Sequence, residues 1–453
     1  MEKFFKLKQR KTTVGTEIMA GVITFMTMAY ILAVNPSVLS AAGMDSTAVL
    51  LATCLASFIG TMCMGLMANL PFALSAGMGV NAFFAFTVCG TMGYSWQVAL
   101  FAVFVEGIIF ILMTLTNIRE AIFNCIPISL KQSVSVGIGL FIAFIGLQNA
   151  QLVVNSDSTL IDMVKFTDNK YTQGICAVLA VIGLMLIAIL HVKKVHGAIL
   201  IGILSTWILG IICELTGLYK PDAAAGFYSL IPSFRMTDFS SLGKTVGQCF
   251  NIDFAGIGIF DFIVIVLSFL FVDMFDTIGT LIGVASKADM LDEEGKLEAV
   301  KPALLADAIA TSSGAVLGTS TTTTFVESAA GVGAGGRTGL TAITTGVLFL
   351  ISMLLAPVFT SIPSFATAPA LIFVGFLMFS NIAKIKFDDE NLTDAIPAYL
   401  GIIAMPLFYS IADGIAVGVV SYVIINLACG KFKKINPLMY VLALLFVLNY
   451  IFL

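Results

Sequence analysis

The chain has 453 residues, of which 59% are hydrophobic and 11% are charged, and its formal net charge is −4. Because a soluble globular protein carries roughly 25% charged residues, this composition excludes that class and predicts an integral membrane protein. The eight cysteines are scattered and form no CxxC pair, which predicts neither a disulfide framework nor a metal site. We expect no cofactor, no metal and no nucleic-acid partner.

Apolar segments follow one another from the basic N-terminus to the end of the chain. Their lengths of about 17–25 residues fit membrane-spanning α-helices, and they lack the alternating pattern of an outer-membrane barrel. We predict an all-α polytopic protein embedded in the lipid bilayer, with fourteen spans and a further apolar run at 436–453 that crosses the membrane or lies along the other helices. The predicted spans are 15–38, 47–69, 71–92, 95–116, 130–148, 172–192, 196–216, 258–285, 300–317, 318–335, 338–360, 368–383, 394–410 and 412–429.

The distribution of basic residues predicts the orientation. With the N-terminus inside, 18 of the 23 lysines and arginines fall in inner connections, and the other five lie in the two longest outer loops. The positive-inside rule therefore predicts a cytoplasmic N-terminus and a location in the plasma or inner membrane.

Short patterns in the first half recur in the second. "LLATCLASFIG" (50–60) and "LLADAIATSSG" (304–314) share LLAxxxAxxxG, and one span downstream "SAGMGVNAFF" (75–84) lies opposite "TTTTFVESAA" (321–330). This match pairs Asn81 with Glu327. Because seven is an odd number, a seven-span repeat enters the membrane in opposite senses. The sequence thus predicts seven plus seven transmembrane helices in an inverted repeat, with a site between the halves near mid-membrane.

Two segments at equivalent places in the halves are poor helix formers. Five of the six residues at 319–324 are threonine, which is β-branched and prefers extended backbone, and "ALSAGMGV" (73–80) is rich in glycine. Extended backbone at membrane depth is tolerated only when it is buried in protein or lines a wet cavity. We predict two short antiparallel strands in spans 3 and 10, each leading into a half-helix that begins near Asn81 or Ser328, with these residues as candidate caps. An unbroken helix with a threonine face is the alternative.

Carboxylates inside the predicted spans are the main candidate functional groups, because a charge at mid-membrane is costly and usually functional. Glu327 lies at the turn from strand to half-helix, and Asp273 and Asp276 lie three residues apart on one face of the eighth span. Facing one cavity, they would accept hydrogen bonds from an N–H-rich ligand and hold a proton. For Glu106 we favour a contact between helices, whereas for Asp307 the structural and functional interpretations are both open.

Aromatic residues accompany these carboxylates in the sequence. Tyr30, Phe83, Phe84 and Phe325 are predicted to flank the same spot, where they could stack on a flat ring. Phenylalanine occurs 37 times in the chain, so packing in the core is an equally good interpretation of the phenylalanines.

Three motifs resemble the signatures of a known family. "GMGVNAFFAF", "DMFDTIGTLIG" and "TSTTTTFVESAAGVGAGGRTGLT" closely resemble those of the azaguanine-type purine permeases, the adenine/guanine/hypoxanthine branch of the nucleobase–cation symporters. The resemblance covers Thr12 to about Gly430. It implies proton-coupled import of a purine base by alternating access. It also implies nucleobase contacts on Asn81, Asp273, Asp276 and Glu327. The uracil/xanthine branch has a Glu–His arrangement in the eighth span, whereas "FDTIGT" here contains no histidine. The proton-coupling arrangement of that branch therefore cannot be transferred to this sequence.

The resulting site prediction combines the residues and the resemblance. The expected substrate-binding residues are Tyr30, Asn81, Phe84, Asp273, Asp276, Thr324, Glu327 and Ser328. Of these, Asp273, Asp276 and Glu327 are expected to couple protons.

The resemblance also implies a division into two domains. The core domain would comprise 13–116 and 258–360, and the gate domain 117–216 and 361–430. An outer loop at 217–257 and a C-terminal apolar segment at 431–453 complete the chain.

Two other function classes were weighed. An intramembrane enzyme is disfavoured because the sequence contains neither HExxH nor GxSxG, and "GVGAGG" (331–336) has no surrounding βαβ unit. An anion exchanger or channel of the same architecture is disfavoured because acidic residues at the site repel anions. The preferred purine, the proton stoichiometry and whether the protein forms a homodimer stay open.

Overall fold

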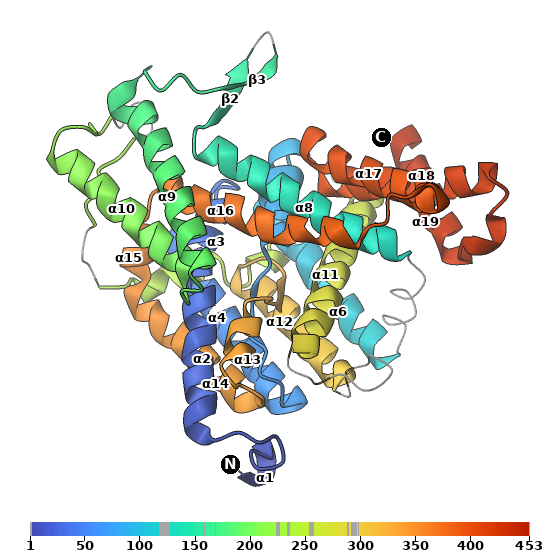
Figure 1. Ribbon diagram of the computed structural model, residues 1–453, viewed down its shortest axis with the longest axis horizontal. Coiled ribbons are helices and arrows are strands. Elements are labelled where there is room, and N and C mark those ends of the chain that lie inside the picture. Colours follow the sequence, from blue (N-terminus) through green and yellow to red (C-terminus); the bar gives the residue numbers. More distant parts are fainter. Residues whose placement is uncertain are drawn as a thin grey trace.

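The computed structural model is almost entirely helical (Figure 1). It describes residues 2–452 except 117–126, 157–158, 168, 223–226, 233–235, 253–257, 288–289, 291–296 and 298. Within these residues, ten helices are long and apolar enough to cross a membrane.

The elements of the first half follow the predicted spans. The membrane-spanning elements are α2 (Val14–Met28) and α3 (Ile31–Ser40), α4 (Ser46–Cys63) with η1 (Met64–Ala68), β1 (Leu74–Ala76) with α5 (Met78–Ala82) and η2 (Phe83–Thr91), α6 (Trp96–Leu115), α8 (Ile128–Asn149), η3 (Lys170–Gly174) with α9 (Ile175–Val192), and α10 (Ala198–Leu215). A short helix α1 (Glu2–Phe5) precedes them. Two strands, the partly buried β2 (Val153–Ser156) and the exposed β3 (Leu160–Met163), pair after α8, which the sequence did not predict.

The second half repeats this order. It contains α11 (Ile259–Lys287), α12 (Val300–Leu317), β4 (Thr322–Thr324) with α13 (Ser328–Gly333), α14 (Gly339–Ser352) with η7 (Met353–Leu355) and α15 (Ala356–Thr360), α16 (Ser364–Phe379), α17 (Leu392–Leu407) and α18 (Ile411–Ala428). Short 3₁₀ segments at Phe239–Lys244 (η5), Gln248–Phe250 (η6), Ser380–Lys384 (η8), Asp389–Asn391 (η9) and Phe432–Lys434 (η10) lie in the connections. Each of the fourteen predicted spans coincides with a helix or with a strand followed by a half-helix.

The final apolar run forms α19 (Pro437–Phe452), which lies along α18 (Figure 1). Tyr450 near its end donates a hydrogen bond to Asp413 Oδ1 near the start of α18, at 2.6 Å, so the two helices run antiparallel.

Strands β1 and β4 pair across the two halves of the chain, as predicted. They are antiparallel, with Leu74 opposite Thr324 and Ala76 opposite Thr322. Two more backbone bonds extend the pair, from Gly77 N to Thr321 O and from Phe325 N to Ala73 O, each at 3.0 Å. Every residue of both strands is buried, so the extended backbone at membrane depth finds its hydrogen bonds within the protein.

The repeated LLAxxxAxxxG motifs lie on α4 and α12, which pack against each other. A Cβ on Gly60 would lie 2.6 Å from Ala310 Cβ, and one on Gly314 would lie 2.7 Å from Thr322 Oγ1. The shared glycines therefore let each helix approach its neighbour or the strand of its own half.

The helices pack in two groups (Figure 1), and the strand pair contacts α4 and α12. In one group α12 packs against α4 and α6, and α14 packs against α2 and α4. In the other group α8 packs against α16 and α17, and α9 packs against α10 and α16.

The predicted start of one half-helix was wrong. α5 begins at Met78 with Gly77 as its N-cap, so Asn81 lies inside the helix, whereas α13 begins at Ser328 as expected, with Glu327 as its N-cap. Gly77 has no side chain to cap its helix, and the Glu327 side chain forms no capping bond. Neither Asn81 nor Ser328 is a cap. Gly77 and Glu327 are therefore the equivalent positions at the two helix starts, not Asn81 and Glu327.

Candidate functional site

Glu327 and Tyr30 form a hydrogen-bonded pair beside the strands. Tyr30 lies between α2 and α3, and its hydroxyl donates to Glu327 Oε1 at 2.8 Å. Tyr30 is 1% exposed, whereas Glu327 is partly exposed. The bond joins the break in the first span to the start of the half-helix in the tenth span.

Asp276 reaches the same junction from α11. It is partly exposed, and its Oδ2 lies 3.6 Å from the position that a Cβ on Gly77 would occupy, at the start of α5. Of the charged groups, Asp307 and then Glu327 lie near enough to Asp276 to influence its charge. The structure thus brings Tyr30, Asp276 and Glu327 together where both half-helices begin.

Asp273 is separated from this group, contrary to the prediction that both aspartates face one cavity. It is 0% exposed, and its Oδ1 accepts from Thr277 Oγ1 at 2.9 Å. The same hydroxyl lies 3.0 Å from Asp307 Oδ2 and 2.6 Å from Thr323 Oγ1. Asp273 and Asp307 therefore belong to a buried polar network that joins α11 and α12 to β4.

Asn81 is also in a buried network and is not brought to the Tyr30–Glu327 pair. Its Nδ2 donates to Asn35 Oδ1 at 2.6 Å, and its Oδ1 accepts from Ser320. Asn35 in turn donates to Thr53 Oγ1 and Thr319 Oγ1. Asn81 is 0% exposed, so in this structure it joins α5 to α3, α4 and the segment that precedes β4.

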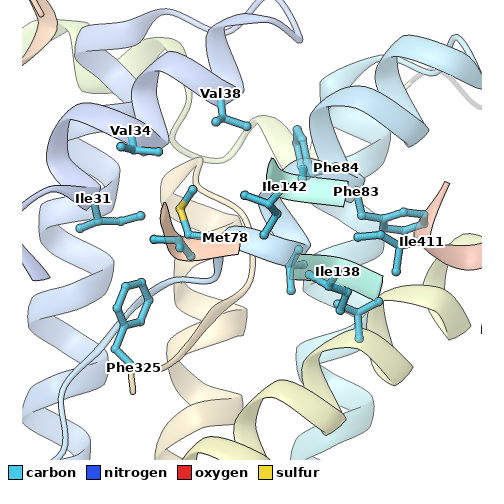
Figure 2. Packing of buried hydrophobic residues seen from close by; sticks show 14 of the residues in the cluster. Ile31, Val34, Val38, Met78, Phe83, Phe84, Ile138, Ile142, Phe325 and Ile411 are labelled. Atoms are coloured by element: carbon cyan, nitrogen blue, oxygen red, sulfur yellow. The ribbon is translucent and has the colours of Figure 1, made fainter. Parts of the chain in front are cut away.

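The aromatic side chains do not converge on one spot, contrary to expectation. Phe83 and Phe84 pack against Phe269, with ring centroids 4.8 and 6.5 Å apart. In Figure 2 they lie beside Ile411, whereas Phe325 lies on the opposite side of Met78, toward Ile31. Phe84 is thus part of the core, and Phe325 is the phenylalanine next to the Glu327 turn.

The remaining predicted residues, Thr324 and Ser328, lie on either side of this turn. Ser328 is fully buried, and its Oγ accepts from Ala73 N at 3.0 Å, which ties α13 to the start of β1. Thr324 is 2% exposed, and its hydroxyl has no hydrogen-bond partner among the described residues.

Glu106 makes a structural contact, but to a non-helical segment rather than between two helices. It is fully buried on α6 and accepts from Thr321 Oγ1 at 2.9 Å, so it connects that helix to the segment before β4.

Apolar side chains from both helix groups border the junction. In Figure 2, Met78 lies between Ile31, Val34 and Val38 of α3 and Ile138 and Ile142 of α8. Two partly exposed carboxylates and a phenol beside such a surface suit a flat ligand with N–H donors on its edge and disfavour an anion.

Comparison with known proteins decides the family. The model of the Permease family (Xan_ur_permease) matches residues 15–438. The adenine permease AdeP of Escherichia coli is 40% identical over 100% of this chain and 96% of its own length. The guanine/hypoxanthine permease PbuO of Bacillus subtilis is 42% identical over 98% of each chain. The chain belongs to the Permease family.

Solved structures show the fold of this permease. The transmembrane domain of a cyanobacterial bicarbonate transporter, BicA, superimposes with a TM-score of 0.63 at 14% identity, over 89% of this chain and 97% of that one. The murine anion transporter Slc26a9 gives 0.57 at 14% identity, over 92% of this chain and 68% of that one. The permease is thus a multi-pass transporter with an inverted-repeat fold, and its family consists of permeases rather than enzymes.

Sequence reasoning missed one buried carboxylate of the permease. Glu17 lies near the start of the first predicted span, where the sequence alone indicates no more than a boundary residue. It is 0% exposed and accepts from the backbone N–H groups of Arg337 and Thr338 and from Thr341 Oγ1. Its burial could not be recognised from the sequence, because charged residues are common near the ends of spans.

Proposed function

We propose that the permease is a proton-coupled symporter that imports a purine base, namely hypoxanthine, guanine or adenine, by alternating access. The observation that carries the proposal is the junction of Tyr30, Asp276 and Glu327, where two partly exposed carboxylates lie at the starts of both half-helices. The named relatives are permeases for adenine and for guanine and hypoxanthine, which supports this substrate class.

The junction has the chemistry that a purine base requires. Purines present N–H groups on a planar edge, and a carboxylate accepts two such bonds side by side. Met78 and Phe325 supply apolar surface for the ring faces. We assign direct substrate contact to Glu327, Asp276 and Tyr30, and assign Asn81, Phe84, Asp273, Thr324 and Ser328 to the shell that supports them.

Proton coupling follows from placing two carboxylates near one another within the membrane. Their mutual repulsion and the cost of burying charge favour a state in which the pair holds a proton. A neutral base and one or more protons would then cross together.

Alternating access is supported by the two groups of helices. We propose that residues 13–116 and 258–360 form a core domain that carries the junction, and that 117–216 and 361–430 form a gate domain. In this division the two bodies meet at several places, among them the contact of α5 with α8 and that of α3 with α16. We place the protein in the cell membrane with its N-terminus in the cytoplasm.

A competition panel tests the substrate. In cells that lack their own purine carriers, uptake of labelled hypoxanthine is measured against excess adenine, guanine, xanthine, uracil or urate at two pH values. We expect competition by at least one of adenine and guanine, and faster uptake at the lower external pH. Uptake that ignores every purine, or uptake of bicarbonate or chloride in their place, would contradict the proposal.

Glu327→Gln and Asp276→Asn test the roles of the carboxylates. Glu327→Gln is expected to abolish uptake, because the amide replaces one acceptor with a donor and cannot release a proton. Asp276→Asn is expected to abolish uptake or to remove its dependence on the proton gradient. Membrane levels are compared by immunoblot, and normal pH-responsive uptake in either variant would exclude its assigned role.

A further inference from the structure

The half-helix that follows Glu327 is too short to hold that residue in place by itself. α13 has six residues, Ser328–Gly333, and helices this short are unstable without tertiary contacts. The position of the Glu327 carboxylate therefore depends on the element to which α13 is attached.

That element is α2, along a single stripe of its surface. Glu17, Ala20, Thr24 and Thr27 are spaced three or four residues apart and so share one helix face. Thr27 Oγ1 lies 3.4 Å from Glu327 O at the front of α13. Further along, α13 approaches the backbone of α2 so closely that a Cβ on Gly331 would lie 2.6 Å from Ala20 O.

Glu17 closes the far end of this contact. Its Oε1 accepts from Arg337 N at 2.9 Å, and its Oε2 accepts from Thr338 N at 3.2 Å and from Thr341 Oγ1 at 2.6 Å. A fully buried carboxylate is stable only when its oxygens are satisfied, and bonds from N–H groups to a charged acceptor are strong. Glu17 therefore fixes the backbone between α13 and α14.

Arg337 links this fixed backbone to α13. Its Nη1 donates to Val332 O at 2.6 Å and to Gly336 O at 2.8 Å, which satisfies carbonyl groups at the end of the half-helix. The hydrogen bonds thus run from Glu17 through Arg337 to α13, whose N-cap is Glu327.

We propose that Glu17 is a positioning residue for the substrate site: it clamps α13 onto α2 and thereby sets the location of Glu327 relative to Tyr30. Glu17 precedes Thr27 by ten residues, or about 15 Å along a helix, so it acts through the backbone and not by touching the substrate. The inference rests on the proposed function, because it assumes that Glu327 binds the transported base.

The test compares two Glu→Gln variants. Glu17→Gln keeps the size of the side chain but removes its charge. It also places the N–H donors of the new amide group against the backbone N–H groups of Arg337 and Thr338. The control is Glu214→Gln, since Glu214, at the end of α10, likewise accepts bonds from a hydroxyl and a backbone N–H, those of Ser229 and Leu230, but far from α13 in the chain. Both variants are purified in detergent, and Tm, hydrogen exchange of the 325–338 backbone and purine uptake kinetics in cells are measured.

For Glu17→Gln we expect faster exchange across 328–338 and a KM raised roughly tenfold or more, because small misplacements of a binding group are costly. Vmax, normalised to the amount of protein in the membrane, is expected to change by a smaller factor than KM. Glu214→Gln is expected to lower Tm less, because Glu214 is partly exposed, and to leave KM and the exchange of 325–338 unchanged. Unchanged exchange in Glu17→Gln, or a KM equal to that of Glu214→Gln, overturns the proposal.

The exchange measurement separates this inference from the proposed function. It needs no substrate, so it reports on the clamp even if the wild-type protein takes up no purine base. In that case the substrate assignment fails, and exchange alone decides whether Glu17 holds α13. Raised exchange supports the clamp, and unchanged exchange overturns it.

Discussion

Glu327 lies at the point where a strand becomes a helix, and one phenol holds its carboxylate. The bond from Tyr30 is 2.8 Å long and connects two spans that lie about 300 residues apart in the chain. Because Tyr30 is almost fully buried, water cannot readily replace its hydroxyl if the bond is lost. The pair is therefore the most sensitive single contact of the candidate site.

Tyr30→Phe removes this hydroxyl and keeps the ring. A hydrogen bond to a charged group contributes about 1.5–3 kcal/mol, so we expect KM for the purine to rise roughly tenfold or more. Uptake kinetics measure the effect. Tyr219→Phe is the control: the Tyr219 hydroxyl donates to Tyr228 O at 2.7 Å in the connection after α10, so its loss should leave KM unchanged. Equal KM values in both variants would show that the Tyr30 bond has no role in binding.

Individual residues were the hardest features to predict from the sequence. Asp273 and Asp276 share a helix face in the sequence pattern, yet one is buried in a threonine network and the other lies beside Gly77, because neighbouring helices and strands decide which carboxylate is covered. Asn81 was paired with Glu327 by a short match of biased composition, and such a match cannot fix a register to within a few residues. Tyr30 and Glu327 do meet, as the prediction that they flank one spot requires.

At the scale of secondary structure, the paired strands require a very close approach at Gly77. Its backbone is ordinary extended structure, with φ −70° and ψ 125°, so alanine could adopt the conformation. A Cβ there would nevertheless lie 2.7 Å from Thr323 Cγ2 in the facing strand. Glycine is required at this position because there is no room for a Cβ atom, and not because the backbone is strained.

Gly77→Ala is expected to displace one strand and to destabilise the protein by about 1–3 kcal/mol, the usual cost of overpacking. Uptake should fall more than expression, because Asp276 lies beside the new methyl group. Thermal unfolding in detergent and uptake measure the two effects. Gly15→Ala is the control: no atom lies within 4 Å of the added carbon, so neutral or slightly raised stability is expected. A Gly77→Ala protein as stable and active as Gly15→Ala would refute this account of the strand contact.

The N-terminal end of α4 carries a charged cap whose contribution to stability depends on pH. Asp45 accepts from Ala48 N at 2.9 Å and pairs with Lys244 at 2.6 Å. Partial burial raises the pKa of Asp45, but the hydrogen bond and charge of Lys244 and the backbone bond of Ala48 outweigh this, and the pKa lies below its ordinary value of 3.8. A carboxyl group with a lowered pKa stabilises the folded state at neutral pH, and this stabilisation is lost as the pH falls through the folded pKa.

Asp45→Asn keeps a good capping side chain and removes the charge. We expect a small loss of Tm at pH 7, because the ion pair is solvent-exposed. The difference in Tm between the variant and the wild type should shrink as the pH is lowered below 3.8. Thermal unfolding at several pH values measures this. A difference that stays constant or grows toward acid would contradict the linkage.

Elements were predicted better than residues, and for physical reasons. The Thr319–Thr324 run combines β-branched residues with a location between apolar spans, so a buried strand with a partner was the consistent interpretation. The glycine-rich segment at 73–80 could pair, but its composition does not mark where the strand ends. The β2–β3 hairpin was missed because its residues, such as Leu160 and Met163, are exposed and lack a strong strand pattern.

At the scale of the whole molecule, two simple properties determined the predicted architecture. The separation of apolar runs defined fourteen spans, and the LLAxxxAxxxG repeat indicated two halves of opposite orientation, which the fold of the solved transporters bears out. The proposed division of the helices into a core and a gate domain does not follow from such patterns. It depends on which apolar faces meet, and the faces of α8, α16 and α17 have compositions like those of the other spans.

The pairing of β1 with β4 also has a consequence for biosynthesis. Residues 74–76 leave the ribosome long before 322–324, the only strand with which they pair among the described residues. Until the tenth span arrives, the peptide groups of the third span lack their native partners within the bilayer or the translocon. The third span of the nascent first half must therefore be shielded from lipid by other protein or stay partly outside the bilayer. Pairing of the two strands is then a late folding step that joins the two halves of the protein.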